Sequence, residues 1–376
     1  MEINARAPAK VILFGEHYVV YGAPGIVAAI EPYNEVGFSW KKGARGRLGY
    51  ESTQKESNAD VFANEKTGKD NSGGRQAIFC SREIPTAHPI AAIYCHYVKR
   101  YPQICEMEIK ARVKKAWGLK GVGNSASLAA CFSLCAREAL GLPSGIGGIF
   151  DDVQVGEAAA HGKPSGIDAS AVCYGGVLEF RKKFAGVRLD GGRAGNKGAG
   201  NKFERPDVKK MDFEVGDGHS FLLIDTLKKD GARSSTKEMI GKFAAANGVG
   251  KAPAEMEKGE RGKICEDYLD IYKAAARAIK NSDAHAIAQC MNENHALLKK
   301  FGVSSQSIEL AVKTSVKAGA AGAKMTAAGG IGGAAVALCP DEKISGIKKE
   351  LRRSGFGTYE FRVAERGVHK KGGAQK

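Results

Sequence analysis

Apolar residues occur along this chain in short runs, separated by polar or glycine-rich segments. Runs bounded by turn-forming residues predict buried strands. These are residues 11–14, 26–30, 36–40, 106–113, 176–180, 220–225, 335–338 and 358–363. Apolar residues at helical spacing predict helices at 89–101 and 343–353, and a long helix with a stripe from Tyr268 to Ile279. Because strands and helices do not strictly alternate, the pattern predicts an α+β fold.

Helix-capping residues mark further helix ends in the second half of the chain. Ser235 with Glu238 has the spacing of a capping box. Asp283 is expected to cap a helix that Gly302 ends, and Ser304 or Ser305 to cap the next one. The region after residue 225 is therefore expected to be mostly helical.

The first candidate site is the segment 7–22, APAKVILFGEHYVVYG. Lys10 enters the apolar run, and Gly15, Glu16 and His17 follow it. A buried strand would thus carry ionisable groups at both of its ends, where a site could be built. A first strand with an ordinary polar turn is the alternative interpretation.

A glycine loop opens a helix in the segment 118–141, GLKGVGNSASLAACFSLCAREALG. Asn124 or Ser125 is expected to be the N-cap, and Gly141 to follow the last turn. Free N–H groups at a helix start bind phosphate, and a hydroxyl there can ligate Mg²⁺. The loop is neither a Walker loop nor a dinucleotide-binding GxGxxG, and an ordinary turn remains open as an alternative.

Two further segments complete the pattern: 156–170, GEAAAHGKPSGIDAS, and 319–338, GAAGAKMTAAGGIGGAAVAL. In this order the four segments resemble the motifs of the GHMP kinase superfamily, and most closely those of its mevalonate kinase family. The matched positions span residues 7–333. The resemblance implies a domain similar to ribosomal protein S5 domain 2 over residues 1–213 and a ferredoxin-like domain over 214–376.

The chain departs from the family pattern in both glycine loops. The first loop reads GVGNSA where GLGSSA is usual, so Asn124 replaces a serine, and Trp117 and Leu119 stand where proline and glycine are expected. In the last motif Ala327 and Ile331 replace glycines. Since a β-branched residue rarely adopts positive φ, either residue 331 has an ordinary backbone or the loop is reshaped.

The resemblance also implies roles for individual residues. Asp168 would accept or orient the proton of the substrate hydroxyl, and Lys10 would stabilise charge on the transferred phosphoryl group. Ser125 and Glu157 would hold Mg²⁺, and Pro164 and Gly166 would break the helix between Glu157 and Asp168. Glu16, His17 and Thr326 would contact the substrate. The residues expected to contact ATP are Leu119, Lys120, Gly121, Val122, Gly123, Asn124 and Ser125.

The net charge of +16 raises the question of nucleic-acid binding. Lys and Arg exceed Asp and Glu by 3, 7 and 3 in residues 41–75, 181–210 and 364–376, which accounts for most of this charge. These segments lack apolar periodicity, so they are expected to be mobile basic loops and a basic tail. No RNA-binding strand pattern is present, and no nucleic-acid partner is expected.

Cysteine usage and hydropathy favour a cytoplasmic enzyme. The nine cysteines form no CxxC pair and are expected to be reduced core residues. The first ten residues lack the apolar region of a signal peptide, and no apolar run reaches the roughly 20 residues of a membrane helix. Neither a membrane partner nor a resident cofactor besides Mg²⁺ is expected. Oligomeric state stays open, with a homodimer as one alternative.

The expected activity is ATP-dependent phosphorylation of the primary (5-)hydroxyl of mevalonate for isoprenoid synthesis. The alternatives are a sibling kinase for phosphomevalonate or a sugar, a decarboxylase of the diphosphomevalonate type, and a non-catalytic binding protein of the same fold. If Asn124 only caps the helix, replacing it with serine should be nearly neutral.

Overall fold

A computed structural model describes most of the chain. The described residues are 1–43, 46–52, 68–69, 75–80, 88–119, 121–184, 204–216 and 218–372. The strands are β1 (Glu2–Phe14), β2 (Pro24–Lys42), β3 (Arg47–Ser52), β4 (Gly68–Lys69), β5 (Arg75–Cys80), β6 (Met107–Lys114), β7 (Val177–Arg181), β8 (Asp207–Met211), β9 (His219–Asp225), β10 (Gly322–Thr326), β11 (Ala334–Pro340), β12 (Gly357–Phe361) and β13 (His369–Lys370). The helices are α1 (Pro89–Arg100), α2 (Asn124–Ala139), α3 (Ile146–His161), α4 (Ile167–Tyr174), α5 (Leu227–Asp230), α6 (Thr236–Ala246), α7 (Lys258–Lys280), α8 (Ala284–Lys300), α9 (Gln306–Lys317) and α10 (Asp341–Arg353), with short 3₁₀ turns at Tyr18–Tyr21, Pro102–Glu106 and Pro253–Glu255.

The larger sheet is organised around the long strand β2. Among the described strands its order is β13-β1-β2-β6-β3-β5-β4, with β7 paired to the first half of β2 and β8 paired to β7. β2 pairs with β1 along its length, with β7 near its start and with β6 near its end. The pairs are antiparallel except that β3 runs parallel to β6.

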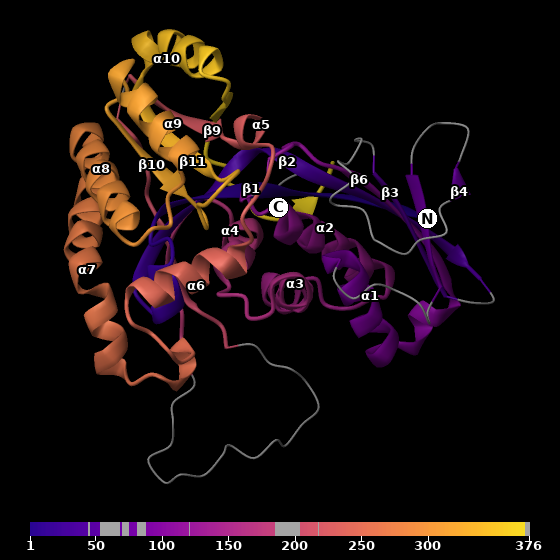
Figure 1. The fold of residues 1–376 in the computed structure, drawn as a ribbon. Helices are drawn as coiled ribbons and strands as arrows, with labels where there is room; N and C mark the ends of the chain where they lie inside the picture. Colours follow the sequence, from indigo (N-terminus) through magenta and orange to yellow (C-terminus); the bar gives the residue numbers. More distant parts are fainter. Residues whose placement is uncertain are drawn as a thin grey trace.

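Helices α1 to α4 cover one side of this sheet (Figure 1). α2 packs against β1 and β2, and α1, α3 and α4 pack around it. Most α2 side chains from Ala126 to Ala136 are buried, as expected for a helix that is apolar on all faces. The start of α2 is thereby fixed against β1, which carries Lys10.

The smaller sheet has the order β10-β11-β9-β12 among the described strands and is antiparallel throughout. Alternate residues of β9 face two apolar clusters. Leu222 and Ile224 pack with Ile347 of α10, whereas Leu223 belongs to a cluster that includes Tyr268 of α7. That second cluster also contains Phe14 of β1, so one continuous core joins the two sheets.

Most of the predicted strands and helices are confirmed, with three informative exceptions. The strands predicted at 26–30 and 36–40 are one continuous strand, β2. The loops predicted at 41–75 and 181–210 contain β3, β4 and most of β8, so those predictions are wrong over residues 47–52, 68–69 and 207–210. Much of both segments lies outside the described residues. β10 was not predicted.

The prediction of a mobile tail at 364–376 is wrong as far as residue 372. The Ala364 N–H donates to the Ala29 carbonyl, and the Ala364 carbonyl accepts from the Gly176 N–H. β13 pairs with the edge of β1 opposite to β2. The end of the chain therefore returns to the first sheet. The domain boundary near residue 213 stays a prediction. Apart from β13, the described strands of the larger sheet end at Met211, and those of the smaller sheet begin at His219. Within the described residues, no helix combines the length and apolarity needed to span a membrane.

Candidate functional site

Lys10 and Asp168 form an ion pair where β1 meets the first turn of α4. Lys10 Nζ lies 3.1 Å from Asp168 Oδ1. The Lys10 side chain is 3 % exposed and that of Asp168 is 29 % exposed, so the carboxylate remains open to a ligand. Gly166 precedes α4 with a left-handed φ of 93°, and this turn aims the first residues of α4 toward β1.

Ser125 and Glu157 meet close to this pair. Ser125 Oγ donates a hydrogen bond of 2.7 Å to Glu157 Oε1. Burial raises the pKa of Glu157 to about 7, and the negative charge of Asp168 adds to the shift. The Glu157 carboxylate thus holds its charge poorly. Together with the Ser125 hydroxyl and the nearby Asp168 carboxylate, it offers the hard oxygen donors that Mg²⁺ prefers.

The glycine loop before α2 lies directly over Lys10. The backbone N–H of Lys10 donates to the carbonyl of Val122 at 2.8 Å. Gly123 has a φ of 72°, and a Cβ at this position would lie 2.8 Å from Lys10 Cγ, so only glycine allows this approach. Leu119 and Val122 are buried, Gly121 is exposed, and Lys120 lies outside the described residues.

The predicted N-cap of α2 is wrong. Gly123 occupies the cap position, and neither Asn124 nor Ser125 caps the helix through its side chain. The Asn124 amide points back to the preceding loop and donates to the carbonyls of Trp117 and Leu119 at 3.1 and 2.7 Å. Neither side chain therefore acts as the expected cap: the Ser125 hydroxyl faces Glu157, and the Asn124 amide holds the loop.

Glu16 is buried beneath the site and forms an ion pair with Lys324 of β10. Both side chains are fully buried, and Lys324 Nζ also donates to the carbonyl of Met325 at 2.8 Å. Burial raises the pKa of Glu16 and lowers that of Lys324, while their attraction opposes both shifts. The predicted substrate contact of Glu16 stays a prediction, and its pairing with Lys324 was not foreseen.

His17 lies at a left-handed backbone position with a φ of 65°. Its ring stacks on that of Phe243 of α6, with 5.1 Å between the ring centroids. Its Nε2 lies 3.1 Å from the carbonyl oxygen of Ala328. Because a carbonyl only accepts, Nε2 carries the proton in this pair. Burial lowers the pKa of His17 to about 4, so the imidazole is neutral near pH 7.

We expect His17 to make the fold sensitive to acid. Its folded pKa of about 4 lies below the unfolded value of 6.5, so its contribution to stability is present above pH 6.5 and is lost as the pH falls toward 4. Between pH 7 and 5 the loss should be roughly 2 kcal/mol. Urea unfolding of His17→Asn should show a correspondingly smaller pH dependence. The exposed His285→Asn is the control, and equal pH dependence in both variants would contradict the assignment.

The last glycine-rich motif connects the two parts of the chain. The Thr326 hydroxyl donates to the Ile12 carbonyl at 2.9 Å and accepts from the Ile12 N–H at 3.2 Å, which ties β10 to β1. Its predicted substrate contact stays a prediction. Ala327 adopts a φ of 58°, whereas Ile331 is absent from the positive-φ residues and is half exposed. The backbone at 331 is therefore ordinary, and the strained substitution is the alanine.

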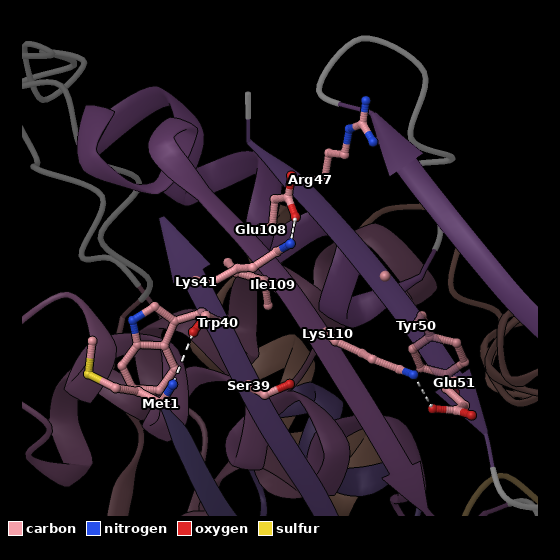
Figure 2. Close-up of a pocket in the computed structure, with 11 residues that line it drawn as sticks. Met1, Ser39, Trp40, Lys41, Arg47, Tyr50, Glu51, Glu108, Ile109 and Lys110 are labelled. Atoms are coloured by element: carbon pink, nitrogen blue, oxygen red, sulfur yellow. Dashed lines mark hydrogen bonds and ion pairs between the residues drawn. The ribbon is translucent and has the colours of Figure 1, made fainter. Parts of the chain in front are cut away.

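A separate groove of about 490 Å³ lies at the far end of the larger sheet (Figure 2). It contains none of the predicted site residues. Two ion pairs line it, Lys41 with Glu108 at 3.0 Å and Lys110 with Glu51 at 3.1 Å. These four charges neutralise one another, and we assign the groove no function.

Comparisons with known proteins agree with the motifs. The family model for the C-terminal region of GHMP kinases matches residues 275–356. A mevalonate kinase from Aeropyrum pernix is 27% identical over 372 residues, which cover 97% of each chain. The crystal structure of L. major mevalonate kinase with R-mevalonate has a TM-score of 0.69 at 24% identity and covers 95% of this chain and 94% of that one. Lactococcus lactis galactokinase reaches a TM-score of 0.70 at 16% identity, with 98% and 95% covered. The structural matches show the fold, which kinases for different acceptors share.

Proposed function

The chain belongs to the GHMP kinase superfamily, and we propose that it transfers the γ-phosphoryl group of ATP to the primary hydroxyl of mevalonate. The observation that supports phosphoryl transfer is the Lys10–Asp168 ion pair, which lies beside both the glycine loop and the Ser125–Glu157 hydrogen bond. The acceptor follows from the relatives that match almost the whole chain and are named mevalonate kinases. The fold alone does not choose the acceptor.

Asp168 and Lys10 would act on the acceptor hydroxyl. The hydroxyl oxygen attacks the γ-phosphorus, the bond from that phosphorus to the ADP oxygen breaks, and the hydroxyl proton passes to the Asp168 carboxylate. The products are a phosphate monoester and ADP. The ammonium group of Lys10, 3.1 Å from Asp168, would attract the hydroxyl oxygen and stabilise negative charge on the transferred group.

The residues around the start of α2 would hold the nucleotide. Backbone N–H groups of residues 121–125, at the positive end of the helix dipole, would face the phosphates. Ser125 and Glu157 would hold Mg²⁺, which when bound neutralises charge on the phosphates. Binding of the cation would also favour the ionised form of Glu157, which burial alone disfavours.

A substrate panel tests this function directly. Purified protein with MgATP should convert R-mevalonate to a product heavier by one phosphoryl group, with one ADP formed per product. Galactose, phosphomevalonate and diphosphomevalonate should give far lower turnover. Mass spectrometry of the product, with ADP release measured in parallel, identifies the reaction.

Each alternative gives a distinct result in the same panel. Turnover with a sugar or phosphomevalonate, but not with mevalonate, would contradict the proposed acceptor. Release of CO₂ from diphosphomevalonate would identify a decarboxylase. ATP binding with no turnover of any acceptor would favour a non-catalytic protein.

A further inference from the structure

The loop before α2 is held by a pair of asparagines that the proposed mechanism does not use. Asn124 opens α2, and its amide N–H groups donate to the carbonyls of Trp117 and Leu119. Asn124, Trp117 and Leu119 are all positions at which this loop departs from the usual family pattern. In this chain they are joined to one another by hydrogen bonds.

Asn34 of β2 holds Asn124 from the other side. Its side chain is fully buried, and its Nδ2 donates to Asn124 Oδ1 at 3.1 Å and to Ser127 Oγ at 3.0 Å. Its Oδ1 accepts from the backbone N–H of Ala116 at 2.7 Å. Asn124 thus uses two donors and an acceptor at once, whereas serine has a single donor. The expectation that Asn124→Ser is nearly neutral is therefore reversed.

The same network fixes the loop relative to the candidate catalytic residues. Ser127 Oγ donates to the Ala7 carbonyl at 2.9 Å, and the Lys10 N–H donates to the Val122 carbonyl. The first turn of α2 and the loop before it are therefore both joined to β1. The Trp117 indole N–H donates to the Pro32 carbonyl at 2.9 Å, and its ring packs edge-on against Tyr359 of β12. The loop is therefore anchored to β1, β2 and β12.

We propose that Asn124, held by Asn34, is a positioning residue that presets the glycine loop for the nucleotide phosphates and so controls nucleotide affinity. The inference rests on the proposed function insofar as the loop binds ATP. Neither asparagine is placed against the acceptor hydroxyl, and the loop that they order is the phosphate-binding element. Loss of the pair should therefore weaken nucleotide binding and leave the KM for mevalonate nearly unchanged.

The test is calorimetric titration of MgADP, which needs no acceptor, into the unaltered protein, Asn124→Ser and Asn34→Ser. We expect both variants to bind MgADP about tenfold more weakly, the effect of losing one or two neutral hydrogen bonds. Because the two residues share one network, the loss of MgADP binding free energy in the double variant should be much smaller than the sum of the two single losses. Steady-state kinetics should show the same increase in the KM for ATP, with less than a twofold change in the KM for mevalonate.

Asn247→Ser is the matched control, since the Asn247 amide also donates to a backbone carbonyl, that of Phe243, at 2.8 Å. It should leave MgADP affinity within twofold of the unaltered protein. A second readout is the emission of Trp117 in a Trp40→Phe background, which leaves one tryptophan. Emission should shift to the red in Asn124→Ser, because a loosened loop exposes the indole.

Unchanged MgADP affinity in Asn124→Ser and Asn34→Ser, or a loss no larger than in Asn247→Ser, would overturn the inference. If Asn124→Ser does not fold, Asn34→Ser, which removes the donor to Asn124 without burying a charge, decides by the same titration. If the unaltered protein binds MgADP but does not phosphorylate mevalonate, only the proposed acceptor fails. If it does not bind MgADP, the inference fails together with the proposed function.

Discussion

Replacing Asp168 with alanine should reduce turnover of mevalonate by about 10²- to 10⁴-fold while MgATP still binds. The carboxylate is partly exposed, lies 3.1 Å from Lys10 and is the group proposed to receive the hydroxyl proton. Because the substitution also leaves the buried Lys10 ammonium without its partner, some loss of folding stability is expected. Measurement of kcat and of nucleotide affinity by calorimetry separates the two effects.

Asp168→Asn distinguishes lost chemistry from lost structure. The amide keeps the shape of the side chain but does not accept a proton, so turnover should be as low as in the alanine variant. Asp151→Ala is the control, since Asp151 forms an ion pair with Arg205 at 2.7 Å on the surface of α3, apart from the site. Turnover within tenfold of the unaltered protein in both Asp168 variants would show that Asp168 is not the proton acceptor.

The second large effect is expected for Ser125→Ala. If Ser125 supplies the loop hydroxyl for Mg²⁺, its removal should lower kcat by about 10²- to 10³-fold and raise the Mg²⁺ concentration needed for half-maximal activity. In the unaltered protein too, the Mg²⁺ concentration needed for half-maximal activity should be higher at pH 6 than at pH 8. Protons compete with Mg²⁺ for the Glu157 carboxylate, whose pKa is about 7. A Mg²⁺ titration of activity at both pH values measures this.

Ser144→Ala provides a matched control for that experiment. Ser144 Oγ donates to Glu138 Oε1 at 2.5 Å, so the same pair of residue types meets beyond the other end of α2. This variant should keep the Mg²⁺ requirement of the unaltered protein. Equal requirements in Ser125→Ala and Ser144→Ala would mean that another group holds the cation.

The strands and helices that could be predicted from the sequence are those with a strong apolar pattern. The start of β1 was missed because its inward positions, such as Ala5 and Ala7, are small alanines between polar residues and give a weak alternation. β8 was taken for a loop because it is an edge strand, and edge strands carry charged side chains that resemble those of a loop. Long-range pairing, which no local pattern encodes, produced both strands.

The candidate site shows the same limit. The motifs identified Lys10, Asp168, Ser125 and Glu157, which the structure brings together in two polar pairs. Local rules gave Asn124 the role of a helix cap, since they do not include Asn34, a partner 90 residues away in sequence. Lys324 was likewise missed as the partner of Glu16, although it lies within the last motif.

The pairing of β13 with β1 has a consequence for the order in which this protein is completed. The outer neighbour of the first strand is synthesised after all the other described strands of both sheets. Until then one edge of β1 has unpaired backbone groups, and such edges invite pairing between chains. A message truncated shortly after β12 would encode every candidate site residue and still leave that edge permanently open. Loss of the residues that follow β12 would thus act as an aggregation defect rather than a catalytic one.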